Sequence, residues 1–250
     1  MERWNGKVAL VTGGSVGIGK ATVEKLVHYG MKVVACARNL EPLNEMVAEL
    51  NKKGPGEMVP FKCDCSKEEE ILEMFDFIKQ KFGAIHVCVN NAGMSFETSI
   101  LSGKTEDWKY MFDLNVIGVC VCMRESVKLM KFAGVDDGHI INIGSLAGKK
   151  VSNKPLYSGT KFALQALNEG LRMELCAAKS HIRSTIICPG FVVTDFLYRM
   201  YKNKEVGDKL FDSMECLKSE DIADCVIYVL GAPAHVEIND VLIRPTEQAL

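Results

Sequence analysis

The sequence predicts an α/β fold in which a parallel sheet of seven strands is covered by helices on both faces. Short apolar runs of strand length alternate with longer amphipathic segments of helix length along the whole chain. Such alternation is typical of a doubly wound sheet. The 250 residues include no Pro- or Ser-rich linker, repeat or low-complexity tract, so residues 1–250 are expected to form a single domain.

The strands are expected at the apolar runs. In chain order these are Val8–Thr12, Lys32–Ala37, Met58–Lys62, His86–Asn90, His139–Ile143, Arg183–Cys188 and Val241–Arg244. The amphipathic segments predict helices over Gly17–Tyr29, Glu41–Lys53, Lys67–Phe82, Glu106–Lys131, Tyr157–Ala178 and Glu220–Leu230. Pro42 suits a first helical turn, and Thr105 and Ser219 are expected N-caps because two acidic residues follow each.

One region breaks this rhythm, the stretch Pro189–Leu217. It follows a strand, is long for a connection to a helix, and mixes aromatic residues and methionines with many lysines and acids. We therefore expect residues 189–217 to form a mobile lid over an apolar ligand.

Composition excludes several classes of partner. The formal net charge of -2 favours neither nucleic acid nor an anionic membrane surface. No stretch approaches the ~20 apolar residues that span a bilayer, and the first apolar run is too short for a secretory signal. The chain is therefore expected to be a cytoplasmic protein with a small molecule as its partner.

The cysteines and histidines do not predict a metal site. The ten cysteines are spread along the chain, and the close pairs, Cys63 with Cys65 and Cys120 with Cys122, lack the CxxC spacing of zinc sites. The five histidines are scattered and form no HExxH motif. Buried, reduced thiols and no bound metal are the expectation.

A glycine-rich turn, TGGSVGIG, follows the first strand directly, and Gly13, Gly17 and Gly19 open a helix there. Glycines let backbone amides approach a pyrophosphate, and the positive end of the helix dipole favours its charge. Such a turn can be purely structural, but its position between strand and helix favours a dinucleotide site. The expected sheet is therefore of the Rossmann type.

The end of the second strand, VVACARN, indicates which dinucleotide binds. An acid here would hold the ribose 2'-hydroxyl of NAD, but Ala37 takes that place and Arg38 follows. A guanidinium can bond the 2'-phosphate of NADP, although Arg38 could also be a solvated loop charge. We expect NADP(H).

Tyr157 and Lys161, in the motif YSGTK, stand four residues apart on a predicted helix. Positions i and i+4 share one helix face, so the ammonium is expected beside the phenol, where its charge would lower the pKa of the tyrosine. The pair is then a candidate general acid and base. Taken alone, the spacing also fits a half-buried aromatic residue with a snorkelling lysine.

Five features together resemble the short-chain dehydrogenase/reductase family. They are TGGSVGIG, NNAG at 90–93, Asn115, Ser145 and YSGTK, in the order and at the separations typical of that family, across essentially the whole chain. The resemblance implies that Ser145 bonds the substrate oxygen and that Tyr157 transfers the proton. Lys161 would lower the pKa of the phenol and bind the nicotinamide ribose, and Asn115 would hold a water that links the lysine to solvent.

The same resemblance implies a set of cofactor-binding residues. Asp64 would bond the adenine amino group, and Thr194 would bond the nicotinamide carboxamide. The full set is Gly13, Ser15, Gly17, Ile18, Gly19, Arg38, Asn39, Asp64, Asn91, Ala92, Gly93, Tyr157, Lys161, Pro189, Gly190, Val192 and Thr194.

Three further stretches, RWNGKVALVTGG, DDGHIINI and VLIRPTEQ, look like one group within this family. That group contains the animal dehydrogenase/reductase family member eleven and insect NADP-dependent farnesol dehydrogenases. The similarity implies a secondary or allylic alcohol, or its carbonyl, on a lipophilic skeleton such as a terpenoid or steroid. The loop from Ser145 to Tyr157 looks shorter than in this group, so substrate identity is not carried over.

Apolar side chains just beyond the carboxyl ends of the strands are candidates for a substrate pocket, because ligands of open α/β sheets bind there. Each could equally belong to the core. These candidates are Met94, Phe96, Leu146, Val151, Leu156, Phe191 and Phe196.

Two other functions are weaker alternatives. Hydrolysis by a Ser–Tyr–Lys set is disfavoured because Ser145 lacks the GxSxG elbow and has no histidine base nearby. An NADPH-binding regulatory protein without turnover would have no chemical reason to retain the four catalytic polar groups. The family also implies a homodimer or homotetramer, joined through the helices expected at Glu106–Lys131 and Tyr157–Ala178.

Overall fold

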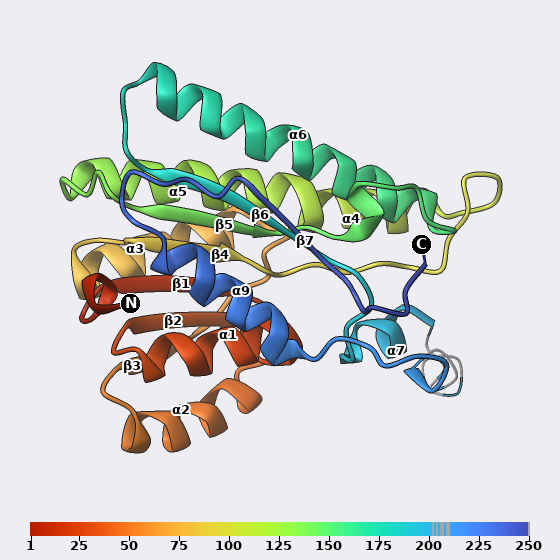
Figure 1. The fold of residues 1–250 in the computed structure, drawn as a ribbon, viewed down its shortest axis with the longest axis horizontal. Coiled ribbons are helices and arrows are strands. Elements are labelled where there is room, and N and C mark those ends of the chain that lie inside the picture. Colours follow the sequence, from red (N-terminus) through yellow and green to blue (C-terminus); the bar gives the residue numbers. More distant parts are fainter. Residues whose placement is uncertain (202, 204, 206–207, 209–210, 250) are drawn as a thin grey trace.

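The computed structural model describes residues 1–201, 203, 205, 208 and 211–249. Its strands form one parallel sheet in the order β3-β2-β1-β4-β5-β6-β7, as expected for a doubly wound fold (Figure 1). The strands are β1 Val8–Thr12, β2 Lys32–Ala37, β3 Glu57–Lys62, β4 Val87–Asn90, β5 His139–Ile143, β6 Arg183–Pro189 and β7 Asp240–Ile243. Each predicted strand is confirmed to within one residue at either end.

The main helices are α1 Gly17–His28, α2 Glu41–Lys53, α3 Glu68–Phe82, α4 Thr105–Phe112, α5 Gly118–Phe132, α6 Pro155–Ala177, α7 Asp195–Tyr201 and α9 Ser219–Gly231. Three shorter helical turns are η1 Glu2–Trp4, η2 Asp113–Ile117 and η3 Leu146–Gly148. Pro42 lies in the first turn of α2, as predicted. The predicted N-caps were wrong by one residue, since Lys104 and Lys218 hold those positions and Thr105 and Ser219 are already helical.

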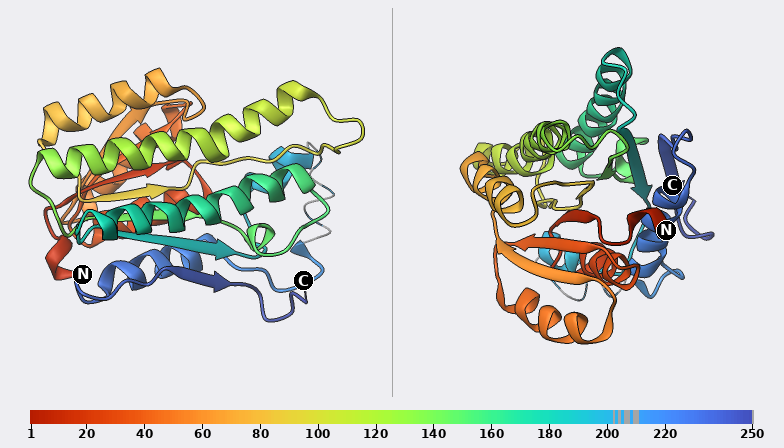
Figure 2. Two further views of the ribbon diagram at one scale, coloured as in Figure 1. Left: turned by 90° about the horizontal axis from the view of Figure 1, so that it is seen from above. Right: turned by 90° about the vertical axis from the view of Figure 1, so that its left-hand side faces the viewer.

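The sheet is buried on both faces, and the alternation of side chains along each strand divides the core in two. Val8 and Leu10 of β1 face α3, α5 and α6, whereas Ala9 and Val11 face α1, α2 and α9. The helices accordingly lie in two layers on opposite sides of the sheet (Figures 1 and 2). Continuous apolar strands are what such double burial requires.

The long helix predicted over Glu106–Lys131 was wrong in one respect. It is interrupted by η2, a π-helical turn between α4 and α5. A π-helical turn accommodates an extra residue, which changes the direction of the side chains that it carries, and such turns are frequent at functional sites. Here the turn carries Asn115.

A chain of buried amide side chains ties the centre of the sheet to α6. The Asn90 amide donates to Asn142 Oδ1 at 2.8 Å, and Asn142 donates to Asn168 Oδ1 at 2.9 Å. Ser184 Oγ donates to the same oxygen of Asn168 at 2.9 Å. These bonds join β4, β5, β6 and α6, the elements that carry or precede the expected catalytic residues.

The predicted lid has a tethered base. A parallel bridge joins Val192 to Leu217, with Val193 N donating to Leu217 O at 2.8 Å. Between them, α7 stands over the carboxyl ends of the strands (Figure 1). Residues 202, 204, 206–207 and 209–210 of this predicted lid lie outside the described residues.

Among the described residues, no helix has the length and apolar character that a membrane crossing would require.

We expect Asn142→Ala to lower the free energy of unfolding by about 1–3 kcal/mol, because the buried Asn90 amide then loses its acceptor. Urea denaturation followed by circular dichroism measures this change. Asn44→Ala on the exposed face of α2 is the control, with an expected change within about 0.5 kcal/mol. Equal losses in the two variants would contradict the proposed role of the amide chain.

Candidate active site

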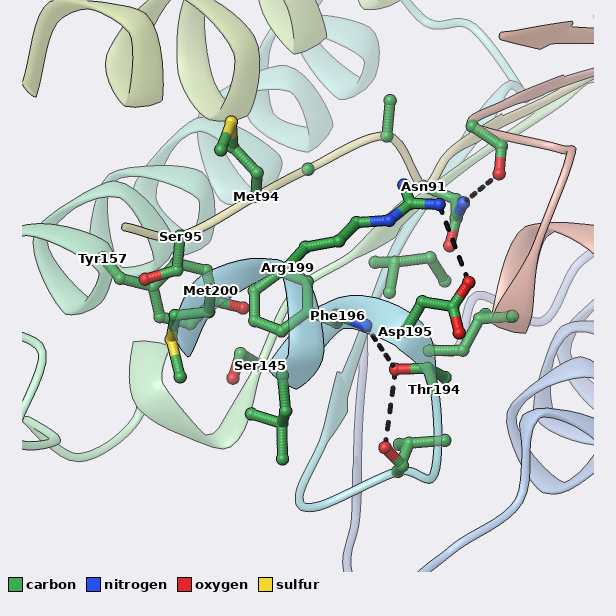
Figure 3. A pocket seen from close by; sticks show the side chains of 18 of the residues that line it. Asn91, Met94, Ser95, Ser145, Tyr157, Thr194, Asp195, Phe196, Arg199 and Met200 are labelled. Carbon is green, nitrogen blue, oxygen red and sulfur yellow. Dashed lines mark hydrogen bonds and ion pairs between the residues drawn. The ribbon is translucent and has the colours of Figure 1, made fainter. Parts of the chain in front are cut away.

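A cavity of about 920 Å³ opens at the carboxyl ends of the strands. The loops after β1, β2, β4, β5 and β6 contribute to its wall, together with α6 and the described part of the lid. The strand order reverses between β1 and β4, which is where open α/β sheets bind their ligands. Figure 3 shows the wall formed by β4, β5, α6 and α7.

The glycine-rich loop forms one end of this cavity. Gly13, Ser15, Gly17 and Ile18 line it, and α1 starts behind them. The N-cap of α1 is Val16, which offers no side-chain acceptor, and no acidic residue lies in the first turn. The positive end of the helix is therefore left for an external anion.

Gly19 was predicted to bind the cofactor, but it does not line the cavity. A Cβ at this position would lie only 2.2 Å from the carbonyl oxygen of Gly13 and 2.5 Å from the Asn91 amide nitrogen. Gly19 therefore allows α1 to pack closely behind the loop. This packing role is one that the spacing of the glycines could not distinguish from ligand contact.

Arg38 and Asp64 lie at the same end, near the ends of β2 and β3. Arg38 Nη1 donates to the hydroxyl of Tyr110 at 2.9 Å, and its side chain remains exposed at the cavity. Asp64 accepts bonds from the backbone amide and the hydroxyl of Ser66 at 3.0 and 2.8 Å. A guanidinium and an oriented carboxylate thus face this end of the cavity.

The predicted catalytic trio meets at the other end. Ser145 and Tyr157 both line the cavity, and the Ser145 hydroxyl accepts the backbone N–H of Ala147 at 3.1 Å. The Lys161 ammonium is buried and donates to the carbonyl of Ile143 at 2.8 Å. It lies 5.7 Å from the centre of the Tyr157 ring. Figure 3 shows Ser145 and Tyr157 on neighbouring parts of the cavity wall.

The expectation that Lys161 makes the phenol acidic was wrong for the chain itself. Burial raises the pKa of Tyr157 to about 12, and the hydrogen bond to Ser145 opposes this rise only in part. Burial likewise lowers the pKa of Lys161 to about 8. Desolvation penalises the charged form of each group, and it is the largest cause of both shifts.

Asn115 does not line the cavity. Its Oδ1 accepts the backbone N–H of Met94 at 2.9 Å, and its Nδ2 donates to the Met94 carbonyl at 2.8 Å and to Thr160 Oγ1 at 3.2 Å. The side chain therefore braces the segment after β4 against α6, one residue before Lys161.

All of the other predicted cofactor residues line the cavity. They are Arg38, Asn39, Asp64, Asn91, Ala92, Gly93, Tyr157, Lys161, Pro189, Gly190, Val192 and Thr194. Asn91 also holds the β1 end in place, because its Nδ2 donates to the carbonyls of Thr12 and Gly13 at 2.9 and 3.1 Å.

Some of the predicted substrate residues line the cavity and others do not. Met94, Leu146, Val151, Phe191 and Phe196 line the cavity. Phe96 and Leu156 do not, and the Phe96 ring instead packs against Tyr110 at 6.2 Å between ring centres. Apolar character alone could not separate the two groups, because an apolar side chain can pack in the core as well as line a cavity.

Helix α7 of the predicted lid brings an aromatic ring against Tyr157. The centres of the Phe196 and Tyr157 rings are 5.5 Å apart. Met200 of the same helix, α7, lies on the same side of the cavity, and Arg199 extends across it while pairing with Asp195 at 3.7 Å (Figure 3). The site is therefore apolar around the reacting hydroxyl and charged toward its nucleotide end.

Several lining residues were missed by sequence reasoning. The set includes Cys63, Cys65, Ser95, Tyr110, Lys150, Ser152, Asn153, Lys154, Arg199, Met200, Tyr201 and Gln248. The length and composition of residues 189–217 predicted a lid but not which side chains turn inward. Gln248 ends the stretch VLIRPTEQ, but the resemblance of that stretch to a group of proteins did not assign a role to this side chain.

Gln248 fastens the C-terminal tail to the start of the lid. Its Oε1 accepts the backbone N–H of Phe191 at 2.9 Å, and a Cβ on Gly190 would lie 2.2 Å from that oxygen. Glu247 accepts the backbone N–H of Glu215 at 3.0 Å, near the other end of the lid. The tail therefore holds both ends of the lid.

Known proteins are similar to this chain over nearly their whole length. Dehydrogenase/reductase SDR family member 11 of Gallus gallus is 51% identical over 253 residues, covering 99% of each protein. Farnesol dehydrogenase of Aedes aegypti is 39% identical over 249 residues, covering 98% of each. A solved structure described as the closed form of serine dehydrogenase complexed with NADP+ superposes with a TM-score of 0.89, at 30% identity over 97% of this chain and 96% of that chain.

A family model matches most of the chain, including residues that line the cavity at both ends. Residues 7–205 match the family described as short chain dehydrogenase, and this range contains the glycine-rich loop and the Ser145, Tyr157 and Lys161 trio. The chain therefore belongs to the short-chain dehydrogenase family of oxidoreductases.

Proposed function

We propose that this chain transfers a hydride, with NADP(H) as cofactor, between the nicotinamide and a carbonyl or a secondary or allylic alcohol of a lipophilic substrate. A terpenoid or a steroid is the substrate class that we favour. The observation that carries the proposal is that Ser145, Tyr157 and Lys161 share the cavity that the glycine-rich loop also lines, with the Lys161 ammonium 5.7 Å from the centre of the Tyr157 ring.

The chemistry follows from what these three side chains can do. The bound reduced nicotinamide supplies the hydride that adds to the carbonyl carbon. Ser145 and Tyr157 then donate hydrogen bonds to the carbonyl oxygen, on which negative charge develops. The Tyr157 proton completes the alcohol, and the phenol recovers a proton from solvent.

The pKa of Tyr157 bears on the direction of the reaction. A value of about 12 keeps the phenol protonated at neutral pH, which suits proton donation to a carbonyl oxygen. Alcohol oxidation needs the phenolate, and Lys161 is the positive side chain placed to stabilise it. Lys161 is therefore more important for oxidation than for reduction.

The cofactor assignment rests on the nucleotide end of the cavity. The uncapped start of α1 suits a pyrophosphate, and Arg38 faces the cavity where a ribose 2'-phosphate would lie. The similar serine dehydrogenase structure is described as an NADP+ complex. A metagenomic short-chain oxidoreductase solved with NADP, with a TM-score of 0.81 and 30% identity, supports the same cofactor.

The substrate class rests on the opposite end. Apolar side chains of Met94, Leu146, Val151, Phe196 and Met200 line the cavity, and the Phe196 ring packs against the ring of Tyr157. The Aedes aegypti relative is named farnesol dehydrogenase, and farnesol is an allylic alcohol on an isoprenoid chain. We propose that residues 189–217 act as a lid that closes over such a substrate.

We further propose that the chain forms a homodimer or homotetramer in the cytoplasm. Apolar side chains are exposed on the helices expected to meet a partner, with Ile117, Phe162 and Met173 exposed to 53%, 41% and 59%. All ten cysteines are free thiols, which supports a reducing compartment.

Tyr157→Phe is expected to lower kcat/KM for carbonyl reduction by about 10²–10⁴, because it removes the proton donor and little else. Loss of NADPH absorbance with a panel of ketones, quinones, steroids and isoprenoid aldehydes measures this rate. Full activity in the variant would contradict the role of Tyr157. NADPH binding by the parent with no turnover on the whole panel would instead favour the regulatory function.

Arg38→Asp is expected to raise the KM for NADPH by about 10- to 150-fold, since a charge-assisted hydrogen bond to the 2'-phosphate is lost. The KM for NADH should change far less, because NADH has no 2'-phosphate. Tyr110→Phe is a matched control that removes only the hydroxyl to which Arg38 donates. Equal changes for the two cofactors would exclude Arg38 from the 2'-phosphate site.

Gln248→Ala is expected to raise the KM for the carbonyl substrate about 2- to 10-fold, since one backbone hydrogen bond at the base of the lid is lost. The kcat should change less, because Gln248 lies away from the Ser145 and Tyr157 hydroxyls. Gln248→Glu retains an acceptor for the Phe191 N–H and should restore the KM. Failure of that rescue would argue against a positioning role for this side chain.

A further inference from the structure

Three cysteine sulfurs converge at the nucleotide end of the cavity. Cys36 Sγ lies 3.8 Å from Cys65 Sγ, and Cys63 Sγ lies 4.0 Å from Cys65 Sγ. All three sulfurs lie within 4.8 Å of one another, and all three residues are buried. We call Cys36, Cys63 and Cys65 the thiol cluster.

The fold assembles this cluster from two neighbouring strands. Cys36 lies in β2, and Cys63 follows the last residue of β3. The strands run parallel and in register, with Ala37 opposite Lys62 and Cys63 N donating to Ala37 O at 3.1 Å. No metal motif is visible in the sequence, because Cys36 stands far from the other two and Cys63 and Cys65 are not in a CxxC motif.

The separations of the sulfurs match those of metal ligands. A tetrahedral zinc with Zn–S bonds of about 2.3 Å places its sulfur ligands about 3.8 Å apart. The two shorter separations in the cluster, 3.8 and 4.0 Å, are close to this value. One ion can therefore reach all three sulfurs after small side-chain movements.

We propose that Cys36, Cys63 and Cys65 form a three-thiolate site for Zn²⁺. Binding forms three Zn–S bonds and releases three thiol protons to solvent, which leaves a site with a net charge of -1. A fourth, exchangeable ligand such as water completes the tetrahedron from the cavity, because Cys63 and Cys65 line it.

The surroundings of the sulfurs agree with a site that needs a cation. Hydrogen bonding to Cys36 and Cys63, followed by burial, raises the pKa of the Cys65 thiol, whereas hydrogen bonding to Cys36 and Cys65 lowers the pKa of Cys63. The charge of a bound metal ion would compensate the loss of the thiol protons.

The site has a consequence for cofactor binding, which rests on the proposed function. Cys63 and Cys65 flank Asp64, and all three residues line the nucleotide end of the cavity. An ion held by both sulfurs would place its exchangeable fourth ligand at the cavity wall beside the Asp64 carboxylate. Zn²⁺ and NADP(H) are therefore expected to bind in competition.

The test uses Cd²⁺ as an optical probe, since Cd²⁺ shares the ligand preference of Zn²⁺ and its thiolate bonds absorb in the near ultraviolet. Titration of the reduced, full-length protein without oxygen should give a charge-transfer band that saturates at one Cd²⁺ per chain. Added Zn²⁺ should abolish the band. Neither readout depends on activity or on NADP(H). A failure of the metal site can therefore be distinguished from a failure of the proposed function.

Variants identify the ligands. Cys65→Ser should weaken Cd²⁺ binding by more than ~100-fold. Mutation of a residue that only supports a metal ligand already lowers metal affinity by about 10- to 100-fold, and the loss of a ligand should lower it further. Cys88→Ser is the matched control, since Cys88 is equally buried but lies outside the thiol cluster. A thermal melt of each variant establishes that it is folded, and Cys36→Ser replaces Cys65→Ser if the latter is not.

Three results would overturn the site. The first is that the parent shows no saturating Cd²⁺ band, and the second is that folded Cys65→Ser binds Cd²⁺ as the parent does. The third is a loss of two titratable thiols, which would show that a disulfide forms in place of metal binding. Competition is tested by NADPH fluorescence with Zn²⁺ present. An NADPH affinity unchanged at saturating Zn²⁺ would contradict the coupling to the cofactor.

Discussion

The parallel pairing of β1, β4, β5 and β6 is the constraint on which the site depends. In a parallel sheet every strand presents its carboxyl end at the same edge, so the residues that follow the strands meet there. Gly13, Asn91, Ser145 and Gly190 come from four separate regions of the sequence and share one cavity for this reason. The amide chain through Asn142 holds the same strands and α6 together inside the core.

The depth of the site decides its electrostatics. Tyr157 and Lys161 are close enough to interact, yet burial moves the pKa of each toward its neutral form. The chain therefore holds a protonated phenol and a lysine whose charge is easily lost. A group that brings positive charge into the cavity would shift this balance toward the phenolate, which links proton transfer to occupation of the nucleotide site.

The lid and the C-terminal tail form one unit at the open side of the cavity. Phe196 and Met200 cover the phenol from α7, while Gln248 and Glu247 hold the backbone at the two ends of the lid. This arrangement explains how a segment with few core contacts keeps a defined position at its base. It also places residues from the end of the chain beside those that follow β6.

The sequence by itself determined the strand and helix pattern, the nucleotide loop and the Ser145, Tyr157 and Lys161 trio, because periodicity and short motifs are local properties. Only the tertiary structure decided which side chains line the cavity. Gly19 and Asn115 support the backbone from behind, whereas Gln248 and Cys65 face the cavity. It also decided the pKa of Tyr157 and the meeting of Cys36 with Cys63, because burial and strand register arise only when distant segments pack together.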